Sequence, residues 1–143
     1  MKKTFLVLAL FFSVESWSQQ SSKLAIENAM GVLDSFMTHF NERDMKKWSE
    51  TLNYPHVRFA GGEVTVWDTK EEYSAIDIFD TLKSTGWHHS SWLSRKVILV
   101  SEKKVHISTI FQRYDENNNP LKQYQSLYIC LLYTSPSPRD VEE

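Results

Sequence analysis

Two histidine positions stand out because imidazole is the side chain that most often moves a proton near neutral pH. His56 alternates with Val57 and Phe59 in a strand-like run, and His88 stands next to His89. The sequence leaves two interpretations of His56 and His88 open. They are general bases facing a cavity, or they are structural residues that only form hydrogen bonds.

Metal and nucleotide sites have less support. In an extended chain, His88 and His89 point to opposite faces, so they do not easily chelate one metal ion together. A metal site built from His56, either His88 or His89, and a carboxylate is the remaining alternative. The sequence contains no cysteine pair, His-x-x-x-His spacing or aspartate-rich loop that would support it. The chain also lacks the glycine-rich phosphate-binding motifs and the Gly-x-Ser-x-Gly motif of serine hydrolases. We therefore predict no metal and no cofactor.

Aromatic residues with polar tips suit a pocket for a small apolar or aromatic ligand. Each alone is better explained by an ordinary core or dimer-interface role, but as a group they favour a pocket. Arg113 is costly to bury unless it is paired, so it forms an ion pair, binds an anion or lies at the surface. The candidate ligand-binding residues are Tyr54, Trp67, Trp92, Arg113, Tyr124 and Tyr128.

The composition bounds the class of protein. A length of 143 residues with 41% hydrophobic residues is typical of one globular domain. The formal net charge of −2 provides no basic excess for binding phosphates, so we predict no nucleic-acid partner. Cys130 is the only cysteine, which excludes an intramolecular disulfide, and its apolar strand predicts a small core residue.

The first 18 residues have the pattern of an export signal. Lys2 and Lys3 precede an apolar run at residues 5–12, and Ser16-Trp17-Ser18 matches a small-x-small cleavage site. This run is too short to span a membrane. We expect cleavage after Ser18, no membrane anchor afterwards, and a periplasmic or secreted bacterial protein.

Helical patterns open the remaining chain. Apolar residues recur at helical spacing over residues 24–40, and Asn41 is expected to end this helix. Asp44 is a suitable N-cap for a shorter second helix. A third helix is predicted after Thr69, which forms a capping box with Glu72, and Gly86 fits just beyond its end.

Strand patterns occupy the rest. A hairpin turns at Gly61-Gly62, and three longer strands are predicted at about residues 93–100, 105–114 and 121–132. The order of elements indicates an α+β fold in which helices cover one face of a curved antiparallel sheet. The tail at residues 133–143 resembles a translated adapter sequence, which would mean a longer natural protein. A disordered tail is the alternative, and residues 19–132 form the predicted domain.

This order of elements resembles the nuclear transport factor 2-like superfamily, the cone-shaped α+β fold shared with SnoaL-like proteins. The resemblance is carried by residues 36–44 (Phe-Met-Thr-His-Phe-Asn-Glu-Arg-Asp) and 54–67. Residues 86–92 and 124–128 are similar to exported bacterial members of unknown function.

The resemblance implies a cavity between the helices and the concave sheet face, and a homodimer formed through the sheet. Similar proteins include isomerases, dehydratases, epoxide hydrolases and polyketide cyclases, beside members that only bind or assemble. The isomerases and cyclases carry an acidic base in the first strand. Here residues 56–60 contain no carboxylate, so His56 would be the substitute base.

Three hypotheses follow, and the sequence leaves open whether the chain is an enzyme. The first is an exported protein that binds a small apolar or aromatic ligand in its cone. The second is a SnoaL-like isomerase, dehydratase or hydrolase with His56 or His88 as base and a tyrosine as hydrogen-bond donor. The third is a non-catalytic module that dimerises through the sheet. A histidine within hydrogen-bond reach of a carboxylate inside the cavity would favour the enzyme.

Overall fold

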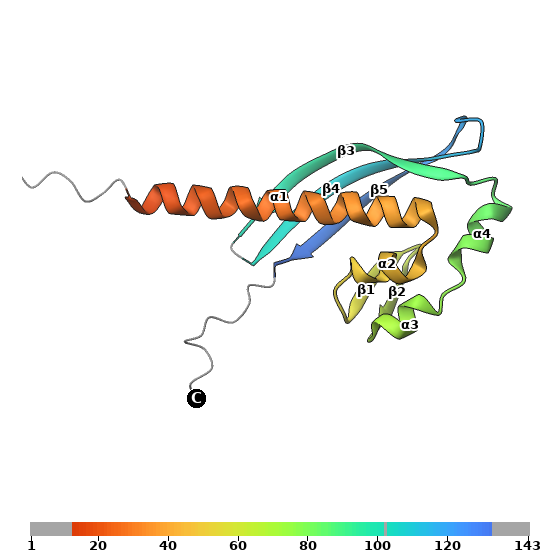
Figure 1. Cartoon of the computed structure of the whole chain (residues 1–143), viewed down its shortest axis with the longest axis horizontal. Coiled ribbons are helices and arrows are strands. Elements are labelled where there is room, and N and C mark those ends of the chain that lie inside the picture. Colours follow the sequence, from red (N-terminus) through yellow and green to blue (C-terminus); the bar gives the residue numbers. More distant parts are fainter. Residues whose placement is uncertain (1–12, 102, 133–143) are drawn as a thin grey trace, which may run out of the picture.

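The computed structural model describes residues 13–101 and 103–132. A long helix, α1 (Ser13–Glu42), lies against an antiparallel sheet of strand order β3-β4-β5 (Figure 1). A smaller lobe beside them contains a two-stranded hairpin and short helices. The sheet consists of β3 (His89–Val100), β4 (Lys104–Tyr114) and β5 (Pro120–Leu131), and the lobe of α2 (Met45–Glu50), β1 (His56–Ala60), β2 (Glu63–Trp67), α3 (Lys70–Ser74) and α4 (Ile78–Ser84).

The first core lies between α1 and the inner face of the sheet. Ala25, Ala29 and Leu33 recur every fourth residue, so they share one face of the helix and are buried there. They pack against Val105 and Ile107 of β4, both of which are fully buried. The small alanine side chains allow the helix backbone to approach the sheet closely. This core fixes the inner sheet face relative to α1.

The second core is aromatic and joins the lobe to the end of α1. Its buried members come from α1, α2, α3, α4 and the segment before β3, and their rings contact one another at centroid distances of 5.0 to 5.2 Å. These contacts, rather than strand pairing, hold the hairpin lobe in place. The buried residues of this aromatic core are Phe40, Trp48, Tyr73, Leu82 and Trp87.

The end of the first helix differs slightly from the prediction. The helix continues to Glu42, and Arg43 adopts the left-handed φ of 59° that commonly follows a helix C-terminus. Asn41 does not end the helix, because its side chain bonds the backbone of Ser90 in both directions, at 2.9 and 2.8 Å. The predicted cap of the second helix is confirmed, since Asp44 accepts a hydrogen bond from the backbone N–H of Lys47 at 3.0 Å.

The prediction of a single third helix was wrong, because the chain forms two short helices there, α3 and α4. Thr69 caps α3 as predicted, accepting from the backbone N–H of Glu72, whose carboxylate accepts from the N–H of Asp68. Ala75 then ends α3, and Asp77 leaves the helical region with a ψ of 75°. Aspartate favours caps over helix interiors, which explains the break that apolar periodicity did not reveal.

The strand predictions are confirmed. The hairpin pairs His56 with Trp67 and turns through Gly61 and Gly62, whose φ values of 64° and 82° suit glycine. On β4, the predicted alternation places Val105, Ile107 and Thr109 on the buried face. The hairpin departs from the pattern in one respect. Its apolar face, which is made by Val57, Phe59, Val64 and Val66, is exposed.

Most of the predicted signal sequence and the whole predicted tail, residues 1–12 and 133–143, lie outside the described residues. Within them, α1 begins at Ser13, ahead of the predicted cleavage point at Ser18. Among the helices described in residues 13–101 and 103–132, none is long and apolar enough to cross a membrane. Cleavage and export remain predictions.

Candidate ligand-binding cleft

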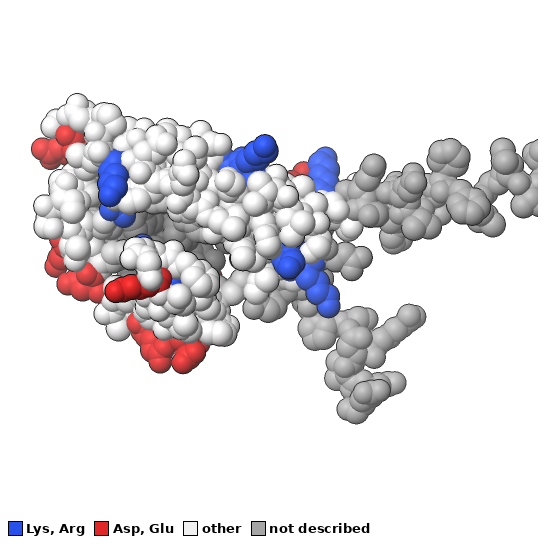
Figure 2. Space-filling model, turned by 180° about the vertical axis from the view of Figure 1, so that it is seen from behind, with Lys and Arg blue, Asp and Glu red and all other residues white. Residues whose placement is uncertain are grey.

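The candidate site is an open cleft between the hairpin lobe and the inner face of the sheet. Figure 2 shows the surface hollowed between the lobe and the main body of the molecule. Phe36 of α1 lies between the two walls. Its ring meets Trp48 of the lobe at 5.4 Å and Tyr128 of β5 at 5.6 Å.

The lobe wall is built around Tyr73. His56 stacks on Trp67 at a ring distance of 5.7 Å, and both meet the edge or face of Tyr73, at 5.3 and 5.1 Å. Tyr54 contacts Tyr73 at 6.3 Å and donates its hydroxyl hydrogen to the Ser49 carbonyl at 2.9 Å. Three predicted site residues, His56, Trp67 and Tyr54, therefore share one wall, which is organised by the buried Tyr73, a residue that was not among the predicted site residues.

Tyr128 and Trp92 form the deep part of the sheet wall. Their rings meet edge to face at 5.8 Å, and both pack against the first core. Burial raises the pKa of Tyr128 to about 12, so its hydroxyl stays protonated and can donate a hydrogen bond. The indole N–H of Trp92 is buried and has no hydrogen-bond partner among the described residues. Both predicted residues lie on the inner face.

Arg113 and Tyr124 continue the sheet wall. One terminal nitrogen of Arg113 donates to the Tyr124 hydroxyl at 3.2 Å, and the guanidinium lies 4.6 Å from the centre of that ring. The Phe111 ring stacks on the Tyr124 ring at a centroid distance of 5.0 Å. Burial lowers the pKa of Arg113, and the positive charge of Arg58 lowers it further. The Nε atom of Arg113 is buried without a partner in the described structure.

Arg58 faces the cleft and was not among the predicted site residues. It follows His56 by two positions on β1, and therefore lies on the same hairpin face. Burial has the largest effect on the pKa values of Tyr73, Tyr128 and Arg113, and the positive charge of Arg58 lowers the pKa of each of these wall residues. The strand alternation could have identified Arg58. Residues two positions apart share a strand face, so if His56 faces the cleft, Arg58 does as well.

The two candidate bases are not brought together. His56 is half-buried in the lobe wall, and burial, then Arg58, lowers its pKa, which favours the neutral imidazole. His88 is exposed at the start of β3, where its backbone N–H donates to Tyr114 and its ring nitrogen lies 3.3 Å from His89. Thus His88 shares no described contact with the cleft residues.

Among the residues that the structure describes, no carboxylate forms a hydrogen bond or ion pair with His56 or His88. Within the described residues, the histidine–carboxylate contact is His39 with Glu42, at 3.1 Å near the end of α1, away from both cleft walls. Also within residues 13–101 and 103–132, no group of three or more His, Cys, Asp or Glu side chains is arranged to hold a metal ion. Cys130 is half-buried at the edge of the first core, where burial raises the pKa of its thiol.

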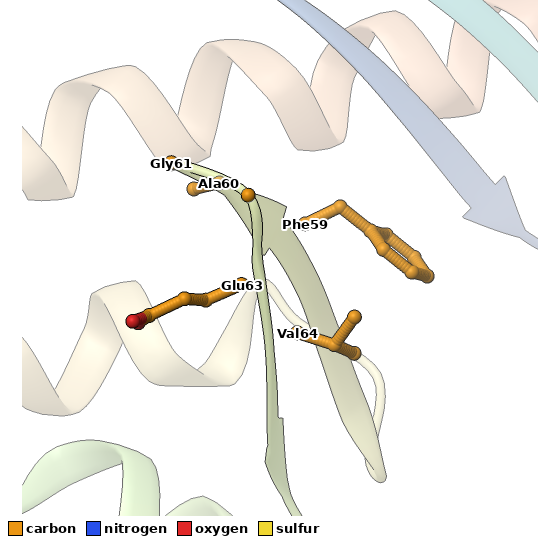
Figure 3. A pocket seen from close by; sticks show the side chains of 6 residues that line it. Phe59, Ala60, Gly61, Glu63 and Val64 are labelled. Carbon is orange, nitrogen blue, oxygen red and sulfur yellow. The ribbon is translucent and has the colours of Figure 1, made fainter.

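A separate depression of about 350 Å³ lies at the tip of the hairpin, lined by residues 59–64. Figure 3 shows Phe59 and Val64 pointing to one side of the hairpin and Glu63 to the other. The depression is formed by one turn and is open to solvent. It lacks the convergent polar groups of the cleft, and we do not assign it a ligand.

Comparison with known proteins gives one match. A family model described as NTF2-like protein (DUF6841) matches residues 27–134. No curated protein and no solved structure matches the chain.

Proposed function

Because the chain belongs to the NTF2-like family DUF6841 and has its α+β fold, as predicted from the sequence, we propose that it binds a small apolar or aromatic molecule in the cleft. The observation that carries this proposal is the aromatic sheet wall. Tyr128, Trp92, Phe111 and Tyr124 form consecutive ring contacts from 5.0 to 6.1 Å on one face, and each is only partly buried. Partly buried rings with polar tips supply the apolar contact and the few hydrogen bonds that small-molecule sites use.

The test uses a neutral apolar fluorophore, N-phenyl-1-naphthylamine, with the purified protein. We expect saturable binding that Tyr128→Leu weakens, because this substitution removes a ring and a hydroxyl from the cleft wall. Val57→Ala is the control, since Val57 is an exposed apolar residue on the hairpin face opposite to His56 and lies outside both the cleft wall and the proposed dimer face. Non-saturable binding, or equal effects of the two substitutions, would contradict the proposal. Native mass spectrometry of protein from its own host then identifies a retained ligand.

A second candidate function is an isomerase, dehydratase or hydrolase. It is favoured by the lowered pKa of His56, which keeps the imidazole unprotonated near neutral pH and able to accept a proton. The protonated hydroxyl of Tyr128 supplies a hydrogen-bond donor on the facing wall. Against it stands the lack of a carboxylate beside His56 in the described residues, since an orienting group normally holds a catalytic base.

The enzymatic candidate is tested by NMR titration of the His56 imidazole with and without a bound ligand. A pKa that is below the ordinary value and moves on binding is expected if the imidazole faces the bound molecule. An ordinary pKa that ignores the ligand would remove His56 from the site.

A homodimer through the outer sheet face is also proposed. Leu127, Ile129 and Leu131 of β5 alternate along that face, and all three are exposed. Contiguous exposed apolar residues are typical of an interface. Sedimentation of the protein and of Ile129→Lys tests this, with dimer expected for the first and monomer for the second.

We further propose export by the N-terminal signal, for which N-terminal sequencing of the mature protein should begin at Gln19.

A further inference from the structure

We propose that the cleft selects ligands that carry a carboxylate beside an apolar or aromatic body, with Arg58 and Arg113 binding the carboxylate. This inference rests on the proposed ligand-binding function and names the class of ligand. It concerns two guanidinium groups from opposite walls, one on the hairpin and one on the sheet.

The partners of the described arginines separate them into two kinds. Arg95 forms an ion pair with Asp34 of α1, at 2.6 Å. Arg43 donates to the backbone carbonyls of Asn41 and His88, at 3.4 and 3.0 Å. Arg95 is thus paired with a carboxylate, and Arg43 is held by backbone carbonyls although its Nε atom is buried without a partner in the described structure.

Arg58 and Arg113 have no such partner. In the part of the chain that the structure describes, neither forms an ion pair with a carboxylate. Among the described residues, the Arg113 side chain donates to the neutral hydroxyl of Tyr124, and its Nε atom is buried with no partner there. Lys122 adds a third positive charge, 5.1 Å from the centre of the Tyr124 ring.

This arrangement is unfavourable without an anion. Arg113 is half-buried with its Nε atom unpaired, so its charge has lost water without gaining a carboxylate among the described residues, and the charge of Arg58 on the hairpin wall opposes it further. An anionic group between the walls would remove the repulsion and would accept hydrogen bonds from both guanidinium groups. The cleft therefore has electrostatic complementarity to a negative ligand, although the whole chain carries a net charge of −2.

A carboxylate fits better than a phosphate. Phosphate sites usually add several backbone N–H groups from a helix N-terminus or a glycine-rich loop. Here the charged residues project from strands, where the backbone N–H groups of β4 are used by pairing with β3 and β5. The surrounding wall consists of Tyr128, Phe111 and Trp92, which suits the flat apolar body of an aromatic acid.

The experiment compares two probes of nearly equal shape, 2-naphthoate and its neutral amide 2-naphthamide, by titration calorimetry at low salt. We expect the carboxylate to bind about tenfold or more tightly than the amide, as charge-assisted hydrogen bonds to a partly buried site produce. Arg58→Gln and Arg113→Gln should each reduce this ratio strongly. Lys96→Gln is the matched control, because it removes one positive charge from an exposed position on the outer sheet face.

The outcomes separate this inference from the proposed function. If both probes bind equally, or if Arg58→Gln and Arg113→Gln leave the ratio unchanged, the carboxylate assignment is overturned while ligand binding stands. The carboxylate assignment is also overturned, and ligand binding stands, if N-phenyl-1-naphthylamine binds but neither 2-naphthoate nor 2-naphthamide binds. If none of the three probes binds, the proposed function itself fails. Arg58 is exposed, so its variant tests the assignment even if Arg113→Gln disturbs folding.

Discussion

Replacing Tyr73 by alanine tests whether one side chain fixes the hairpin, and with it the lobe wall of the cleft. Tyr73 is 6% exposed and lies among four rings at centroid distances of 5.1 to 6.3 Å. These four rings belong to Trp48, Tyr54, His56 and Trp67, which come from α2, β1, β2 and the segment between α2 and β1. Neighbours on so many separate elements cannot all move inward to fill the space.

The expected cost follows from this geometry. Truncating a buried aromatic residue to alanine typically costs about 3–5 kcal/mol, through lost burial and the remaining cavity. The upper part of this range applies when the neighbours cannot collapse, and each lost ring pair adds about 0.5–1.5 kcal/mol beyond its buried area. We therefore expect Tyr73→Ala to lower the free energy of unfolding by about 4 kcal/mol.

Tyr73→Phe is the matched control, because it keeps the ring and removes only the hydroxyl. In the described structure that hydroxyl forms no hydrogen bond, so we expect a change below about 1 kcal/mol. Guanidinium denaturation followed by far-UV circular dichroism measures both variants, and amide hydrogen exchange reports on β1 and β2. A loss of less than about 1 kcal/mol for Tyr73→Ala, or equal losses for both variants, would refute the role given to Tyr73.

Three further predictions concern the two cores and the lobe. Leu33→Ala should cost about 2–5 kcal/mol in denaturation, whereas Val32→Ala, at a residue 43% exposed on the same helix, should change stability by less than about 0.5 kcal/mol. Thr69→Ala removes the hydroxyl that accepts a hydrogen bond from the Glu72 N–H, so it should lower the free energy of unfolding by about 1 kcal/mol. Thr69→Ser keeps a hydroxyl and should retain most of this stabilisation. The folded state disfavours the protonated form of His56. The free energy of unfolding should therefore be at its full value above about pH 6.5 and decrease as the pH falls below it. This decrease should be smaller in the variant His56→Gln.

Local patterns in the sequence predicted the elements because the forces that form them are local. Strand patterns identified β4 and β5, and the glycine pair located the hairpin turn. Helix ends were less accurate. Asn41 has the chemistry of a helix end, but its amide bonds Ser90, a partner far away in the sequence that no local pattern reveals.

The candidate site was predicted only in part, for the same reason. Tyr54, Trp67, Trp92 and Tyr128 were selected by residue type, and the structure distributes them over the two walls of the cleft. His88 was selected by type as well, but it lies at the exposed start of β3. Residue type alone does not decide which of two histidines faces a cleft, because that depends on how the lobe docks.

The docking of the lobe also explains why Arg58 was missed. A charged residue on a short hairpin is usually a solvated surface residue, and composition gives no reason to expect otherwise. Its proposed role depends on the aromatic core, which packs the face of the hairpin that carries His56 and Trp67 against Tyr73 and leaves Phe59 and Val64 exposed. Core packing thus decides which polar side chains of the hairpin share a wall with the proposed ligand-binding residues.

Phe36 connects these two aspects of the molecule. It contacts Trp48 of the aromatic core at 5.4 Å and Tyr128 of the sheet wall at 5.6 Å, so it spans the base of the cleft between two otherwise separate cores. A ligand held by Arg58 on one wall and Arg113 on the other would join the same two parts a second time. Because binding then resists separation of the lobe from the sheet, a bound carboxylate should stabilise the whole fold by mass action, and most strongly when the contact through Phe36 is weakened.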